Sequence, residues 1–204
     1  MSDEPARDWR AMLREPDDAV SVAARQLSER VSPPFLLNHA CRTFGFASLF
    51  AMLDGIPLDR ELVYVGSVLH DLGLTEAYDG PRCFENEGAA AAAAFARDAG
   101  WDALRCETLA NAIRFHMHPR VVPEDLAAGY LLSEATSCDV RGHRLDEVPA
   151  DALADILARY PRLDFTERFI ELFERQARSK PGCLADIYLR SGFADRVRSA
   201  AFPA

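Results

Sequence analysis

An adjacent histidine and aspartate, His70 and Asp71, stand where an apolar run of the sequence ends. A neutral imidazole beside a carboxylate offers two strong ligands for zinc, iron or manganese. If residues 62–72 form a helix that Gly73 ends, both side chains can reach one ion only at the helix end, where the last turn loosens. By itself, such a pair is more often a histidine at the negative end of a helix beside a solvated aspartate. A metal site therefore requires ligands from elsewhere in the chain.

Two further polar residues fall at positions that should face the core. His39 shares a helix face with Phe35 and Phe46, and a buried imidazole needs a partner for each ring nitrogen, which a metal can supply. Asp139 closes an apolar line at the end of another helix. A buried carboxylate is costly unless it is paired or bound to a cation. Two imidazoles and two carboxylates are thus candidates for one metal site: His39, His70, Asp71 and Asp139.

The helices that must position these residues follow from apolar periodicity and from the proline and glycine residues that interrupt it. We expect a short helical stretch around Trp9 and helices over residues 17–31, 34–53, 62–72, 85–98, 102–118, 123–139, 150–160 and 165–180. No stretch shows the alternation typical of a β-strand. The prediction is an all-α bundle of about eight to ten helices, with an N-terminal arm (1–33), a metal-binding core (34–160) and C-terminal helices packed on that core (161–204) as one globular domain.

Composition limits the classes of partner. The net charge of −9 argues against a surface that binds nucleic acid, which requires clustered lysine and arginine. We find no leader sequence and no apolar run long enough to cross a bilayer, and we therefore expect a cytoplasmic protein without a membrane partner. We expect a small-molecule substrate and leave a homodimer open. The five cysteines are scattered and form no CxxC pair, so neither disulfides nor a cysteine-rich zinc site is indicated.

Several stretches resemble one family in particular. The order His, His-Asp, Asp on an all-α chain resembles the HD-domain superfamily of metal-dependent hydrolases, in which those four residues hold a divalent metal. Over residues 34–160 the chain is similar to the cyanamide hydratase-like branch of that superfamily. The stretches that carry this second resemblance are Asn38–Thr43, Leu69–Thr75, Cys83–Ala89, Ala112–His116 and Cys138–Glu147.

The resemblance implies hydration or hydrolysis of a small, neutral substrate such as cyanamide, a nitrile or a related C–N compound. The cofactor would be one divalent metal, with zinc as first choice and iron or manganese as alternatives, and it would activate a bound water. Hydration also needs a nearby proton donor, for which His116 and Glu85 are candidates. His116 could instead be a satisfied core histidine, and Glu85 could merely favour a helix N-terminus. Arg42 could meet a polar or anionic substrate, or pair with a core carboxylate.

Three other functions stay open from the sequence. A phosphohydrolase acting on a nucleotide or another phosphate ester could use Arg42, Arg114 or Arg120. A di-iron oxygenase would add His116 or His118 as a ligand of a second metal. A helical binding module with a vestigial site would hold no stoichiometric metal.

Overall fold

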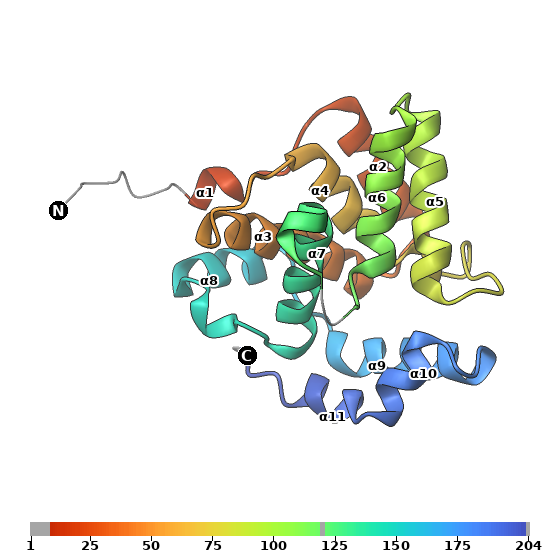
Figure 1. Cartoon of the computed structure of the whole chain (residues 1–204). Helices are drawn as coiled ribbons and strands as arrows, with labels where there is room; N and C mark the ends of the chain where they lie inside the picture. The colour runs from red at the N-terminus through yellow and green to blue at the C-terminus, as the bar shows by residue number, and fades with distance from the viewer. Residues whose placement is uncertain (1–8, 119–120, 203–204) are drawn as a thin grey trace.

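The described residues, 9–118 and 121–202, form an all-helical structure in the computed structural model (Figure 1), which confirms the predicted fold class. Within these residues there are eleven α-helices and two short 3-10 helices and no β-strand. Their bounds are α1 Trp9–Met12, α2 Ala19–Val31, α3 Pro34–Leu53, α4 Arg60–Leu69, η1 Leu72–Leu74, α5 Phe84–Asp98, α6 Ala103–Phe115, α7 Pro123–Arg141, η2 Leu145–Glu147, α8 Ala150–Arg159, α9 Phe165–Ser179, α10 Leu184–Arg190 and α11 Phe193–Arg198.

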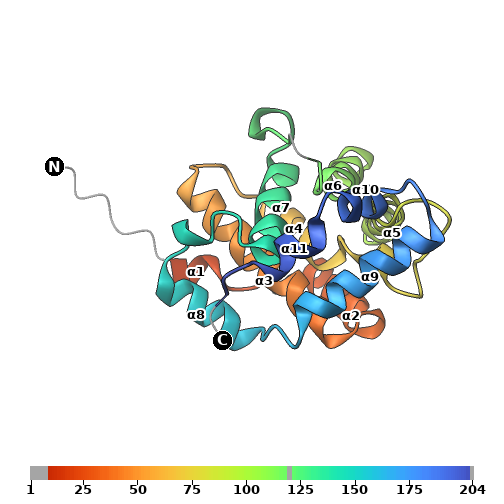
Figure 2. The same cartoon turned by 90° about the horizontal axis from the view of Figure 1, so that it is seen from below.

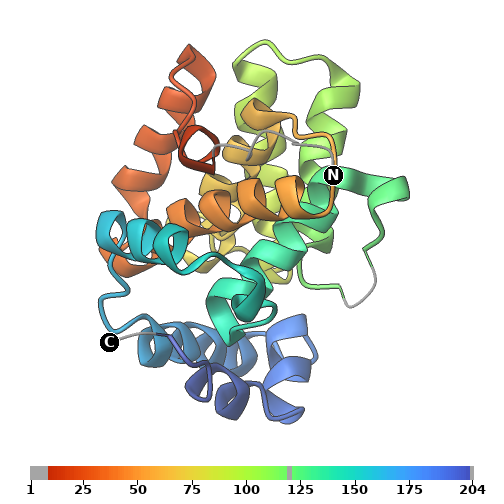
Figure 3. The same cartoon turned by 90° about the vertical axis from the view of Figure 1, so that its left-hand side faces the viewer.

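Helix α3 is the central element of the fold. Residues 39–51 of this helix are all buried, as expected for a helix that is apolar around its whole circumference. Helices α4 and α7 pack on α3, and α5 packs along α6 beside them. Figures 2 and 3 show the same arrangement from two further sides. The side chains that α3 carries are therefore held among several helices.

The C-terminal helices α9, α10 and α11 lie together along one side of the α3 and α7 layer (Figures 1 and 3). They form a second apolar cluster around Phe165, Phe169, Phe173 and Phe193, which also includes Phe84 from the start of α5. Neither α10 nor α11 was predicted, because each is only six or seven residues long and too short for periodicity to show.

Capping residues explain where three of the helices begin. Asp18, Asp59 and Asp102 each accept a hydrogen bond from a backbone amide three residues further on, at 2.8, 3.0 and 2.9 Å. Such caps satisfy amides that have no partner inside the helix. The predicted start at Asp17 and Asp18 agrees with the first of them.

Two helices end earlier than predicted. The helix expected over residues 62–72 ends at Leu69, so that His70 and Asp71 lie in the junction before η1. Gly73 is required there for a close contact, since a Cβ would lie 2.1 Å from the carbonyl oxygen of Phe84. The helix expected to reach His118 ends at Phe115. Pro119, which was expected to stop it, lies outside the described residues.

No helix in the described part of the chain is both long and apolar enough to span a membrane.

Candidate metal centre

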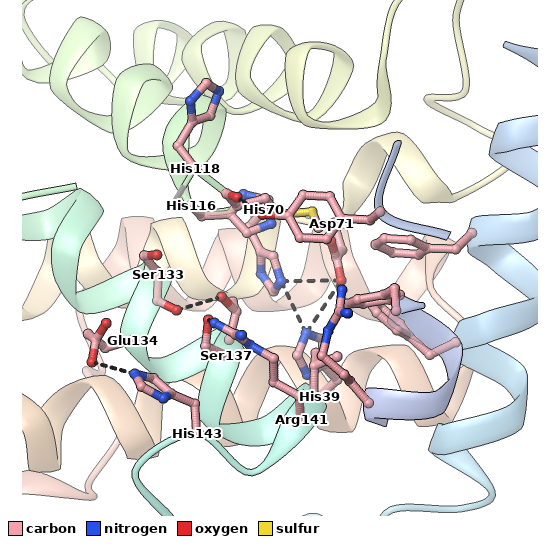
Figure 4. Close-up of a pocket in the computed structure, with 18 residues that line it drawn as sticks. His39, His70, Asp71, His116, His118, Ser133, Glu134, Ser137, Arg141 and His143 are labelled. Carbon is pink, nitrogen blue, oxygen red and sulfur yellow. Dashed lines mark hydrogen bonds and ion pairs between the residues drawn. The ribbon is translucent and has the colours of Figure 1, made fainter. Parts of the chain in front are cut away.

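Three of the four predicted ligands point their side chains at one another (Figure 4). His39 comes from α3, and His70 and Asp71 follow the end of α4. The two Nε2 atoms are 3.2 Å apart, and Asp71 Oδ2 lies 3.2 Å from His70 Nε2 and 3.5 Å from His39 Nε2. Three ligands that each bind a zinc ion at about 2.1 Å in tetrahedral geometry are separated by about 3.4 Å. These three atoms, His39 Nε2, His70 Nε2 and Asp71 Oδ2, form a triangle that has the dimensions of a metal site.

Both histidines use their Nδ1–H group in a hydrogen bond outside the triangle, so neither ring offers a hydrogen-bond donor to it. His39 Nδ1–H donates to Asp139 Oδ2 at 2.7 Å, and His70 Nδ1–H donates to the carbonyl of Ser67 at 2.7 Å. Both Nε2 atoms consequently direct a lone pair into the triangle. Among the described residues, neither oxygen of the buried Asp71 carboxylate accepts a hydrogen bond. Three buried acceptors facing one point are stable only around a positive charge, and the residues therefore fit a divalent cation.

The pKa values of Asp71 and His70 are also shifted in the directions that favour a positive charge between them. Burial raises the pKa of Asp71, but the electrostatic effect of His70, 3.2 Å away, outweighs this and lowers it to about 2. Burial lowers the pKa of His70, but the charge on Asp71 outweighs this and raises it. The carboxylate is thus ionised at neutral pH, as a metal ligand must be.

Asp139, the fourth predicted ligand, lies on the far side of His39 and is not part of the triangle. One oxygen accepts from His39 and from Arg42 (2.8 Å), and the other accepts from Arg42 (2.8 Å) and Arg162 (3.0 Å). Burial raises the pKa of Asp139, and the charge on Arg42 outweighs it and holds the pKa well below its usual range. In this position the carboxylate fixes the tautomer and orientation of the His39 ring.

Arg42 faces Asp139 rather than a substrate. Its guanidinium is fully buried, and it also donates to the carbonyls of Tyr160 (3.0 Å) and Pro161 (3.2 Å). These bonds engage all three of its nitrogens. The sequence left two roles open for Arg42, contact with a substrate or pairing with a core carboxylate. Its hydrogen bonds match the second.

His116 lies beside the triangle as the residue that ends α6. Its ring is buried, and its centroid is 5.0 Å from that of His70. Burial, together with the charge on His70, lowers the pKa of His116 to about 4, so the imidazole is neutral at pH 7. His116 Nδ1–H donates to the carbonyl of Ile113 at 2.5 Å, which leaves Nε2 as a proton acceptor. His118 is exposed and points away from the triangle (Figure 4).

Glu85 is buried at the start of α5, and it is not among the described residues that line the cavity beside the triangle. Burial raises its pKa, and one of its oxygens accepts a hydrogen bond from Asn86. The structure thus brings His116 to the triangle but not Glu85. Their predicted catalytic roles stay predictions.

A cavity of about 500 Å3 opens onto the triangle and His116. Helix α7 lines one side of it with Ser133, Thr136, Ser137 and Arg141, and helices α9–α11 line another with Phe169, Phe173, Tyr188, Phe193 and Arg196. Sequence analysis did not identify these nine residues as part of a site. Phe165, Phe169 and Phe173 recur at helical spacing and indicate a buried face of α9, but nothing in the sequence indicates that this face borders a cavity.

Comparisons with known proteins agree with this geometry. The family model described as "HD domain" matches residues 36–173, which include all three residues of the triangle. The chain is also similar to two cyanamide hydratases of Saccharomyces cerevisiae, DDI2 and DDI3. Each is 25% identical over 178 residues, a stretch that covers 84% of this chain and 79% of the yeast protein.

Proposed function

Because the chain belongs to the HD domain family of metal-dependent hydrolases and hydratases, we propose that it adds water to a carbon–nitrogen bond, as in cyanamide or a nitrile. The observation that carries the proposal is the buried triangle of His39, His70 and Asp71, in which three acceptors face one point without a donor. The similarity to two cyanamide hydratases supports the choice of a C–N substrate.

We assign His39 Nε2, His70 Nε2 and Asp71 Oδ2 as the atoms that hold the metal. Mixed nitrogen and oxygen donors at this spacing suit zinc, with iron or manganese as alternatives. Asp139, predicted from the sequence as a fourth ligand, is proposed here to position His39. When bound, such an ion acidifies water and polarises the group that the water attacks.

His116 is the residue proposed to move the proton. Its neutral ring lies beside the triangle, and Nε2, which carries no proton, can accept one from the attacking water. Hydration of a C≡N bond places the oxygen on carbon and needs a proton on nitrogen, which His116 can then return from the same atom. Its Nδ1–H bond to Ile113 keeps the ring in this orientation throughout.

The arginines named for a phosphohydrolase give that alternative little support. Arg42 is engaged by Asp139, and Arg114 donates to Asn111 at 2.5 Å and does not line the cavity. Arg120 lies outside the described residues. A di-iron oxygenase needs a second group of ligands, and among the described residues only His39, His70 and Asp71 form a group that could hold a metal.

The test is elemental analysis of protein purified without chelator, combined with assays on cyanamide, small nitriles and mononucleotides. We expect one divalent ion per chain and formation of urea from cyanamide or of amides from nitriles. Asp71→Asn should lose both the metal and turnover, whereas Asp98→Asn, which changes an exposed carboxylate on α5, should keep both. Phosphate release without turnover of any C–N compound would contradict the proposal, and so would iron near two ions per chain.

A further inference from the structure

The cavity beside the triangle is much larger than cyanamide requires. Cyanamide is among the smallest organic nitriles, whereas a volume of about 500 Å3 is in the range that holds drug-sized ligands. The triangle and His116 supply only four of the residues that line it. The chemistry of the other lining residues therefore indicates which chemical groups the non-reacting part of a substrate carries.

An aromatic wall forms one side of the cavity. The rings of Phe169, Phe173 and Phe193 follow one another at centroid distances of 4.8 Å, and Tyr188 meets Phe193 edge-on at 5.6 Å. The three phenylalanines are buried and packed against one another. A rigid apolar wall of this kind favours an apolar, and in particular an aromatic, substituent.

Two arginines, Arg141 at the end of α7 and Arg196 on α11, line the same cavity. Arg141 donates to the Ser137 hydroxyl at 3.2 Å, and Arg196 donates to the carbonyl and hydroxyl of Ser191 at 2.6 and 3.0 Å. Within the part of the chain that the structure describes, neither guanidinium pairs with a carboxylate. Both also act on the hydroxyl of Tyr188: burial raises its pKa, and the charges of Arg141 and Arg196 oppose that rise. The packing of α11 on α7 brings both arginines into the lining of one cavity.

The acidic groups of the cavity do not cancel these charges. Glu134 accepts from Arg144 at 3.0 Å and lies 3.5 Å from His143. Asp71 belongs to the triangle. In a chain of net charge −9, two cations without a carboxylate partner at one cavity indicate an anionic ligand.

We propose that the substrate is larger than cyanamide and carries an anionic group, held by Arg141 and Arg196, on an apolar body that packs against Phe169, Phe173 and Phe193. The identity of the group that reacts rests on the proposed function, whereas the presence of an anionic group rests on Arg141 and Arg196 alone. The anionic group can be a carboxylate or a phosphate, since a guanidinium binds both.

The test is calorimetric binding to full-length protein freed of metal with a chelator, so that a probe cannot bind through the ion. The probes are (4-cyanophenyl)acetate, its neutral isostere (4-cyanophenyl)acetamide, and phenyl phosphate. We expect the carboxylate to bind at least about tenfold more tightly than the amide, because a hydrogen bond to a charged group is roughly twice as strong as one between neutral groups. Tighter binding of phenyl phosphate than of the carboxylate would identify phosphate as the anionic group.

Arg141→Gln and Arg196→Gln should each raise the Kd of the carboxylate about tenfold and leave that of the amide unchanged. The matched control is Arg198→Gln, which removes the same charge from α11, the helix of Arg196. Arg198 pairs with Glu167 at 2.8 Å and does not line the cavity. Equal affinity for the acid and the amide would overturn the proposal, and so would an Arg198→Gln effect as large as that of Arg141→Gln.

Turnover by the metal-loaded protein separates this inference from the proposed function. Arginine-dependent binding of the acid without hydration of any C–N compound would refute the proposed function and leave the anionic site standing. Hydration of cyanamide, with no preference for the acid over the amide in binding or in kcat/KM, would support the proposed function and refute the anionic site.

Discussion

His116 and His118 are two residues apart, yet only the first is buried beside the triangle. The helix that precedes them, α6, ends at Phe115. The His116 ring is held inward by its hydrogen bond to the carbonyl of Ile113. His118 is exposed and makes a ring contact with Phe115 at 5.1 Å. The different burial of two neighbouring histidines thus depends on how one helix ends.

His116→Ala should lower kcat by about 10²-fold, the scale for a lost acid–base group, whereas His118→Ala should change it less than about threefold. Metal content tells the possible roles of His116 apart. Unchanged metal content in His116→Ala indicates proton transfer, whereas loss of an ion indicates a ligand. An essential His118 beside a dispensable His116 would contradict the orientation seen here.

At the scale of elements, the triangle depends on how the start of α5 meets the segment after α4. A Cβ on Gly88 would lie 2.7 Å from the carbonyl oxygen of His70, and one on Gly73 would meet Phe84. Both glycines allow the backbones of these segments to approach closely. The position of His70 is therefore set partly by a residue that touches neither metal nor substrate.

Gly88→Ala should displace His70 and weaken metal binding by about tenfold or more, the scale for a disturbed partner of a ligand. Overpacking should also lower the free energy of unfolding by about 1–3 kcal/mol. The matched control is Ala90→Ser on the exposed face of α5, which should change neither. Metal titration followed by calorimetry measures the effect, and unaltered affinity in Gly88→Ala would contradict it.

The end of α3 is tied to the turn after α7 by Arg144, which donates to Asp54 at 2.7 and 3.0 Å. Hydrogen bonds from Arg144 lower the pKa of Asp54 from 3.8. Because the folded-state pKa lies below the unfolded value, this stabilisation is fully present above the unfolded pKa and is lost as the pH falls through the folded one.

Asp54→Asn should therefore lower the free energy of unfolding by up to about 1 kcal/mol at pH 6, since the pair is partly exposed. The difference from the parent protein should shrink as the pH falls below about 4. Urea unfolding at a series of pH values measures it. A difference that persists unchanged to pH 3 would show that the carboxylate charge is not its cause.

For the whole molecule, the triangle joins α3 to the junction after α4, and the segments it joins are central to the fold. A metal that binds only the folded protein stabilises every element linked to this core. Metal removal is thus expected to affect global unfolding rather than one local segment.

Chelation should lower the melting temperature by about 10 °C, because binding at a thousandfold excess over Kd contributes about 4 kcal/mol and each kcal/mol shifts a domain of this size by about 2–4 °C. Asp71→Asn should show no such shift. Calorimetry with and without chelator checks both results.

The sequence by itself was sufficient for the fold class, most helix bounds and the inward direction of His39. These features depend on local physics: apolar periodicity defines the buried face of a helix, and capping residues, proline and glycine define its ends. The bounds of α3, Pro34–Leu53, agree with those predicted from these signals.

Only the tertiary structure decided what each inward side chain meets. Periodicity predicts that Asp139 faces inward, but its pairing with Arg42 spans 97 residues of chain and depends on how α3 packs on α7. The same limit applies to the cavity, where Arg141 and Arg196 come together because α11 folds back onto α7. A sequence pattern identifies the face that is hidden from water, whereas the partner of that face depends on contacts between distant segments.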